Sequence, residues 1–255
     1  MITRESMREL TWVGGNLVNF VLLSMTYKHI FFDLDHTLWD FETNARETLL
    51  ELYSQFNLSG KGIESFPEFH ERYSFHNDIL WERFRKGYIS RDLLRWKRMY
   101  VTLLDFRIAD EPLSREMGKK FLEILPTRTH LFPHALEILD YLGSKNYPLH
   151  LITNGFELTQ QQKLDHSGIA RYFTHMITSE KAGTLKPHRG IFDFALKKVH
   201  ISSGETVMIG DTYEVDIIGA MEAGMDQVWF NPAGYIPVIK PTYTISSLQE
   251  LTGIL

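Results

Sequence analysis

The stretch HIFFDLDHTLWDF, residues 29–41, decides how the rest of the chain is interpreted. It begins with an apolar run, residues 29–32, of the kind that forms a buried strand, and it then ends abruptly in two carboxylates, Asp33 and Asp35. Aspartates are common in exposed turns at strand ends, so the stretch alone fits either an ordinary turn or the tip of a reactive site. The remainder of the sequence has to decide between the two.

Four more apolar runs resemble the first one and are predicted to be buried strands. They lie at residues 148–152, 173–178, 205–209 and 227–230. Helical patterns lie between or beside them, at residues 134–144, 157–167, 188–199 and 213–223. Regular alternation of strand and helix predicts right-handed crossovers, and therefore an α/β fold with a Rossmann-like, doubly wound parallel sheet.

Residues 42 to about 125 interrupt this alternation, because they contain amphipathic helical patterns and no convincing strand. In residues 90–104 the apolar positions recur at helical spacing, whereas Arg91, Arg95 and Arg98 are expected on the opposite, polar side. Ser90 is predicted to cap this helix after a turn at Gly87. We therefore expect a mostly α-helical domain, residues 41–126, inserted into an α/β core formed by residues 25–40 and 127–255.

Composition excludes several classes of function. A chain of 255 residues suits one large domain, or a core that carries an insertion. The net charge of −5 argues against a surface that coats nucleic acid or anchors to a membrane. The absence of cysteine excludes disulfides, thiolate nucleophiles and Cys-ligated zinc.

The N-terminal residues 1–24 are apolar in part, but Asn16 and Asn19 interrupt the run, which is shorter than the ~20 residues of a membrane span. A signal peptide is the alternative, yet acidic residues offset the basic ones and no small-residue cleavage site follows. We expect residues 1–24 to be a loosely attached extension, with Met25 as a possible true start, and we expect a cytoplasmic protein.

Polar residues capable of chemistry follow the predicted strands. They are Asp33, Asp35, Thr153, Asn154, Lys186, Asp211 and Asp216. Ligands of open α/β sheets bind beyond the carboxyl ends of the strands, so these side chains are expected at one edge of one sheet.

Phosphoryl transfer is the reaction that such a set suits. A carboxylate nucleophile divides the displacement into two steps through an aspartyl-phosphate. A divalent cation held by carboxylates removes the repulsion between anions, and hard oxygen ligands are those that Mg²⁺ prefers. A lysine and a hydroxyl at the remaining phosphate oxygens complete the electrostatic support.

Four sequence motifs carry a resemblance to a known family: DLDHT at 33–37, ITNG at 152–155, LKP at 185–187 and GDTYEVD at 210–216. In this order they resemble the motifs of the haloacid dehalogenase-like (HAD) superfamily. The inserted helical domain resembles the small type I cap of that superfamily. An acid at Asp35 argues for phosphate chemistry, because the similar dehalogenases lack one at that position and a halide leaves without a proton.

The resemblance implies a role for each motif residue. Asp33 would be the nucleophile and Asp35 the general acid/base. Thr153, Asn154 and Lys186 would bind the phosphate. Asp33, the backbone carbonyl of Asp35, and Asp211 would bind Mg²⁺, and Asp216 would support the metal site.

The stretches ITNGF, IFDFAL, PTYTISSLQEL and LWERFRKGYIS are similar to the branch of nucleotidases that acts on pyrimidine and noncanonical nucleoside 5′-monophosphates. The implied function is a phosphatase for a small-molecule phosphomonoester, with no polymeric nucleic acid and no membrane as partner. A phosphosugar phosphatase, a phosphosugar mutase of the β-phosphoglucomutase type and a non-catalytic phosphate-binding module are the alternatives. A mutase would share every catalytic residue named above.

Two aromatic residues and a basic cluster are further candidates for substrate contact. Trp39 and Phe41 follow the first motif and either roof the site, where they could stack on a base, or pack between core and cap. His36 is expected to point away from the phosphate. The basic cluster between Arg83 and Arg98 is expected to be a solvated helix face, with one member facing an anionic substrate as the alternative.

Overall fold

The computed structural model of the protein describes residues 11–13, 16–18 and 27–255. Of the expected N-terminal extension, only two short strands are described, β1 (Thr11–Val13) and β2 (Asn16–Val18), which pair antiparallel. The rest of residues 1–24 lies outside the described residues, and so does Met25. Among the helices of the described part, none combines the length and the apolar character that crossing a membrane requires.

A parallel sheet of six strands organises the described chain, with the order β5-β4-β3-β6-β7-β8. The strands are β3 (His29–Phe32), β4 (Leu149–Thr153), β5 (Phe173–Thr178), β6 (Thr206–Gly210), β7 (Asp226–Phe230) and β8 (Tyr243–Ile245). The strand with the opening motif, β3, is central, between β4 and β6. The predicted fold class, a Rossmann-like doubly wound parallel sheet, is confirmed.

Helices cover both faces of the sheet, as the alternation of side chains along β3 requires. Ile30 and Phe32 belong to the core cluster that includes side chains of α5 (Ala135–Ser144) and α6 (Glu157–His166). Phe31 points to the other face and packs in the cluster that includes α8 (Arg189–Val199) and α9 (Ile218–Glu222). A short helix, α7 (Ser179–Ala182), follows β5.

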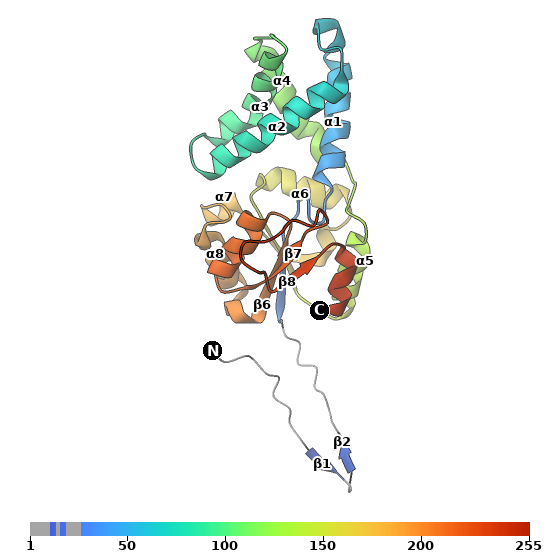
Figure 1. Ribbon diagram of the computed structural model, residues 1–255, viewed down its shortest axis with the longest axis vertical. Helices are drawn as coiled ribbons and strands as arrows, with labels where there is room; N and C mark the ends of the chain where they lie inside the picture. The colour runs from blue at the N-terminus through green and yellow to red at the C-terminus, as the bar shows by residue number, and fades with distance from the viewer. Residues whose placement is uncertain (1–10, 14–15, 19–26) are drawn as a thin grey trace.

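Four helices form the inserted part between β3 and β4: α1 (Phe41–Gln55), α2 (Phe66–Arg85), α3 (Arg91–Asp105) and α4 (Glu111–Ile124). Each begins at a residue whose side chain accepts a backbone N–H of the first turn, namely Asp40, Ser65, Ser90 and Asp110. The predicted cap at Ser90 is therefore confirmed. Figure 1 shows these helices above the sheet, on the side where the helices α6 and α7 that follow β4 and β5 begin.

The polar side predicted for the third of these helices is wrong at one position. Arg98 was expected to face solvent with Arg91 and Arg95, but only 2 % of it is exposed. Its guanidinium lies over the rings of Tyr73 and Phe121, with its carbon 5.9 and 5.3 Å from their centroids. Aromatic faces attract a cation, which is why this arginine is compatible with the interior of the cap.

Candidate active site

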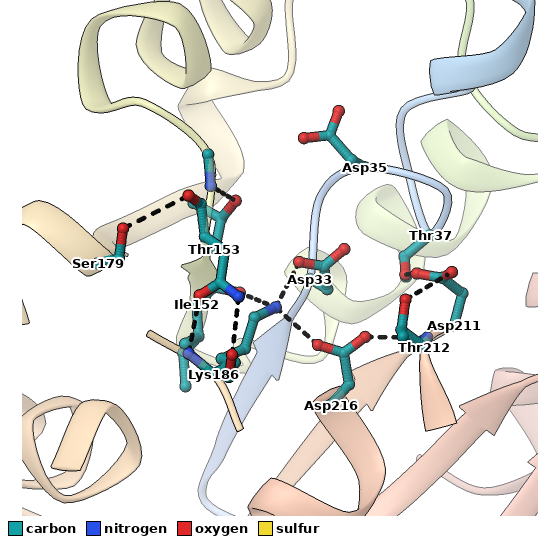
Figure 2. A network of polar contacts seen from close by, with 12 residues as sticks. Asp33, Asp35, Thr37, Ile152, Thr153, Ser179, Lys186, Asp211, Thr212 and Asp216 are labelled. Carbon is teal, nitrogen blue, oxygen red and sulfur yellow. Dashed lines mark hydrogen bonds and ion pairs between the residues drawn. The ribbon is translucent and has the colours of Figure 1, made fainter. Parts of the chain in front are cut away.

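Asp33 lies directly at the end of β3, and its backbone N–H donates to Ile209 O at 2.8 Å, which extends the pairing with β6. Its carboxylate is buried and accepts from Lys186 Nζ at 2.5 Å. The same ammonium group donates to Ile152 O at 2.7 Å and lies 2.7 Å from Asp216 Oδ1. Lys186 therefore joins three segments of the chain at the centre of the sheet edge (Figure 2).

Three carboxylates converge beside this lysine. Asp33, Asp211 and Asp216 each offer an oxygen, and these oxygens lie within 4.8 Å of one another. Asp211 accepts from the hydroxyls of Thr37 at 3.2 Å and Thr212 at 3.1 Å. The predicted convergence of distant strand ends is thus present in the structure.

The loop after β6 is shaped around Asp216. The Thr212 N–H donates to Asp216 Oδ2 at 3.0 Å, which folds residues 212–216 into a tight turn. A Cβ atom at position 210 would lie 2.5 Å from the Cβ of Asp216, so only glycine allows this approach. The sequence prediction of one helix over 213–223 is corrected here: a π-helical turn, Tyr213–Ile217, precedes α9.

Burial and mutual repulsion shift the pKa values of this cluster. Desolvation raises the pKa of Asp33 despite the opposing charge of Lys186, and the charges of Asp216 and Asp211 add to the rise. Desolvation together with the charge of Asp216 raises the pKa of Asp211 to about 6. Desolvation alone would lower the pKa of Lys186, but Asp216 and Asp33 outweigh it and the pKa is raised. The cluster therefore has an excess of negative charge that a cation would relieve.

The donor set of this cluster fits Mg²⁺. All three side chains offer carboxylate oxygens, which are the ligands of a hard cation. Asp33 and Asp211 would hold the ion, and a carboxylate oxygen of Asp216 lies within 4.8 Å of an oxygen of each. Lys186 donates to one oxygen of Asp33, Oδ1.

The residues after β4 have different roles from one another. Asn154 pairs with the backbone of Lys186 on both sides, since Nδ2 donates to Lys186 O at 2.9 Å and Oδ1 accepts from Lys186 N at 2.8 Å. The side chain of Asn154 thus positions the lysine. Thr153 is buried, and its hydroxyl oxygen accepts from Gly155 N at 3.1 Å and from Gln160 Nε2 at 2.8 Å.

Asp35 points away from the three clustered aspartates (Figure 2). Its Oδ1 accepts from Lys163 Nζ at 2.6 Å, and its Oδ2 accepts from Gln160 Nε2 at 2.9 Å. Burial alone would raise the pKa of Asp35, but the charge of Lys163 and these two hydrogen bonds outweigh it and lower the pKa. Gln160 therefore connects Asp35 to Thr153, and Lys163 fixes the carboxylate in its charged form.

The two aromatic candidates have separate positions. Trp39 is fully buried and does not line the cavity, so it fits the packing role and not that of a roof over the substrate. Lys163 Nζ lies 4.4 Å from the centroid of the Trp39 ring, so this ring helps to enclose the lysine. Phe41, by contrast, lines the cavity.

A cavity of about 320 Å³ opens in front of Asp33, between the core and the inserted helices. The core contributes Asp33, Asp35, Thr153, Asn154, Lys186 and Asp216, together with His36, which was expected to point away. Helix α2 contributes Asn77, Asp78, Trp81 and Arg85. Arg85 is the member of the basic cluster that faces the site, as the alternative interpretation of that cluster required.

Sequence reasoning missed Gln160, Lys163, Asn77 and Trp81 as members of the site. Gln160 and Lys163 lie three residues apart on α6, a spacing that places both on one helix face, but that pattern alone does not indicate which face meets Asp35. Asn77 and Trp81 lie four residues apart on α2, a spacing that likewise places both side chains on one face of the helix.

Comparison with known proteins places these observations in a family. The model of haloacid dehalogenase-like hydrolases matches residues 27–224. The pyrimidine 5′-nucleotidase YjjG of Escherichia coli is 32% identical over 243 residues, covering 91% of this chain and 99% of its own. The pyrimidine 5′-nucleotidase PynA of Streptococcus pneumoniae is 29% identical, covering 91% and 96%.

A solved structure is similar over the same region. The HAD-hydrolase YfnB of Bacillus subtilis, crystallised with bound magnesium in a form that reveals interdomain movement, aligns with a TM-score of 0.81. It is 28% identical and covers 89% of this chain and 98% of its own. The likeness therefore extends over both the sheet and the inserted helices.

Proposed function

This chain belongs to the haloacid dehalogenase-like hydrolases, and from that membership we propose that it is a Mg²⁺-dependent phosphatase of nucleoside 5′-monophosphates. Catalysis is assigned to the α/β core, residues 25–40 and 127–255, and substrate enclosure to the cap, residues 41–126. The carrying observation is the group of Asp33, Asp211, Asp216 and Lys186 at one sheet edge, in which all but the half-buried Asp211 are buried.

Asp33 acts as the nucleophile in this proposal. One of its carboxylate oxygens forms a bond to phosphorus while the bond from phosphorus to the nucleoside oxygen breaks. Lys186, which donates to Asp33 at 2.5 Å, offsets charge on the phosphoryl oxygens, and Thr153 lies at the same cavity wall. Bound Mg²⁺, held by Asp33 and Asp211, would supply further positive charge to the phosphate.

Asp35 moves the proton in both steps. In the first step the protonated form of Asp35, which the second step regenerates, gives its proton to the departing nucleoside oxygen. In the second step it takes a proton from water, whose oxygen attacks phosphorus and restores the Asp33 carboxylate with release of phosphate. The ion pair with Lys163 keeps Asp35 charged in the resting site, which favours the second step over the first.

The substrate class rests on two supports. The relatives YjjG and PynA are pyrimidine 5′-nucleotidases, and they align with nearly the whole chain. The cavity presents the aromatic side chains Phe41 and Trp81 in addition to the charged groups, which suits a ligand with a flat ring attached to a phosphorylated sugar.

Phosphate release from nucleoside monophosphates, sugar phosphates and phenyl phosphate, with Mg²⁺ and with a chelator, tests the proposal. We expect continuous release that needs Mg²⁺ and no bisphosphate activator, which separates a phosphatase from a mutase. Asp33→Asn is expected to reduce turnover by about 10⁴-fold or more, whereas the matched control Asp193→Asn, exposed on α8, leaves it unchanged. Undiminished turnover by Asp33→Asn would falsify the assignment of the nucleophile.

A further inference from the structure

Arg98 is a buried cation whose partners are neutral. In the described part of the chain its two hydrogen-bond acceptors are Leu94 O, at 3.1 Å from Nε, and Asn77 Oδ1, at 2.9 Å from Nη1. Burying a guanidinium without a carboxylate costs free energy, which the rings of Tyr73 and Phe121 recover only in part. Arg98 lies behind the wall of the cavity, bonded to the lining residue Asn77, and so costly an arrangement at this place needs a reason other than stability.

The effect of Arg98 is to fix the amide of Asn77. An arginine only donates hydrogen bonds, so the atom of Asn77 that faces it must be the oxygen. The amide nitrogen therefore lies at the other end of the side chain, and among the residues that the structure describes its one hydrogen bond is a long one, 3.4 Å to Asp78 Oδ1. Asn77 is only 7 % exposed, and it lines the cavity in front of Asp33.

A flat apolar surface lies one helical turn further along α2. Trp81 lines the same cavity, and its ring stacks on Phe156 with centroids 6.0 Å apart and an interplanar angle of 30°. Phe156 follows Thr153, Asn154 and Gly155 in the sequence. Its contact with Trp81 therefore anchors this cap residue against the core, next to the loop that carries Thr153 and Asn154. A fixed ring and a fixed N–H donor thus meet at one end of the cavity.

We propose that Asn77 determines substrate specificity by donating its amide N–H to a ring carbonyl oxygen of the nucleobase, while Trp81 stacks on that base and Arg98 positions Asn77. The inference rests on the proposed function, because it names the part of a nucleotide that the cap recognises. A donor held on its far side by an arginine cannot turn to present its oxygen, so it favours a base that carries a carbonyl group.

Binding to the Asp33→Asn protein tests this recognition without turnover. Three ligands are titrated by calorimetry: uridine 5′-monophosphate, ribose 5-phosphate, which has no ring base, and phenyl phosphate, whose ring has no acceptor. Asn77→Ala is expected to weaken the binding of uridine 5′-monophosphate by about tenfold, which corresponds to the loss of one hydrogen bond. The affinities for ribose 5-phosphate and phenyl phosphate should not change.

Two further variants separate recognition from folding. Asn77→Asp keeps the contact with Arg98 as an ion pair but loses the N–H donor, so it should also lose the tenfold preference although the cap stays folded. The added negative charge of the aspartate acts on the phosphate of all three ligands alike. The ratio of the affinity for uridine 5′-monophosphate to those for the other two ligands therefore reports the loss of the N–H donor. Arg98→Met should lose the same preference, whereas Arg72→Met, an exposed arginine of α2, should keep it.

The outcomes are distinct for the two proposals. An unchanged affinity ratio in both Asn77 variants, or an equal loss for ribose 5-phosphate, overturns the base recognition while phosphatase activity stands. If the unmutated protein releases no phosphate from any of the three ligands with Mg²⁺, the proposed function fails, and the affinity ratios still decide whether Asn77 reads the base.

Discussion

Asp35 is held by two side chains of α6, and these contacts determine the charge of its carboxylate. Lys163 Nζ is 2.6 Å from Oδ1, and only 3 % of the lysine side chain is exposed, so water screens this pair poorly. The resulting charged Asp35 is ready to accept a proton, whereas a general acid has to carry one. In the proposed mechanism this charge suits the attack of water on the phosphorylated Asp33 more directly than departure of the leaving group.

Asp35→Asn tests this distinction. We expect the variant to slow overall turnover by about 10²–10⁴-fold, the usual contribution of general acid–base catalysis. With p-nitrophenyl phosphate, whose leaving group needs no proton, it should release one equivalent of p-nitrophenol rapidly and then stall as the phosphorylated enzyme. Rapid-quench measurement of the burst checks this. A slow release without a burst contradicts the assignment to the second step.

At the scale of residues, sequence reasoning found the side chains that follow strands and missed those on helices. Parallel strands end at one edge, so Asp33, Asp211 and Lys186 could be brought together without knowing any packing angle. Lys163 and Arg98 could not be placed in this way. A charged residue on a helix is normally solvated, and only the tertiary contact with Asp35 or with Asn77 gives it a buried position.

Three histidines lie side by side across neighbouring strands. His29 on β3 and His150 on β4 stack with ring centroids 5.1 Å apart, and His150 stacks on His175 of β5 at 5.4 Å. His29 Nδ1 and His150 Nε2 are 2.8 Å apart and share a hydrogen bond. Burial, together with the charges that His29 and His175 would carry, lowers the pKa of His150 from 6.5 to about 3.

This stack predicts a loss of stability in acid. In the unfolded chain His150 takes up a proton below about pH 6.5, whereas in the folded protein it stays neutral down to about pH 3. The unfolded state therefore binds more protons in that window, and the free energy of unfolding falls by up to about 1.4 kcal/mol per pH unit as the pH decreases. Above pH 6.5 the contribution of His150 is complete and flat.

Urea unfolding at pH 5, 6 and 7 measures this effect against His150→Gln, which retains an amide for His29 but cannot titrate. The variant should show a slope of stability against pH that is smaller by about 1 kcal/mol per unit between pH 5 and 6. His166→Gln on α6 is the matched control and should leave the slope as it is. Equal slopes for the unmutated protein and His150→Gln would show that this histidine is protonated in the folded state.

At the scale of elements, the predicted strands agree with the structure to within one residue at each end. The apolar runs of β3, β4, β6 and β7 are mostly buried on both faces, whereas the edge strand β5 is only partly buried. Sequence reasoning did not find β8 or α7. Each has only three or four residues, which is too short for a period to be visible. The π-helical turn Tyr213–Ile217 also has no periodic signal, since it depends on the bond from Thr212 N to Asp216.

At the scale of the whole molecule, two contacts between the cap and the core differ in character. On one side, buried Asn44 joins the two connecting segments, since its side chain donates to Asp40 O and His130 O and accepts from His130 N. On the other side, Phe156 of the core inserts into a cap cluster with Leu80 and Leu94. The first contact consists of polar bonds at the chain crossings, and the second is an apolar contact next to the cavity.

Phe156 is expected to set the balance between closed and open arrangements of the cap. Its ring, 7 % exposed, stacks on Trp81 and lies under the guanidinium groups of Arg95 and Arg91, at 5.0 and 5.6 Å. Opening the cap would expose this ring to water, at a cost of about 1.5–3 kcal/mol. The nearby ion pair between Arg91 and Glu180 is partly exposed and contributes little beside it.

Phe156→Ala should therefore shift the equilibrium toward the open arrangement by about 10- to 100-fold, with a higher KM and a smaller change in kcat. Because the chain has no cysteine, two can be introduced for fluorescent labels, at exposed Arg72 of the cap and Lys240 of the core, and energy transfer between them reports closure directly. Leu158→Ala removes an exposed apolar side chain two residues further along and serves as the matched control. If transfer in Phe156→Ala equals that of the unmutated protein, the apolar contact does not set the position of the cap and is a consequence of closure and not its cause.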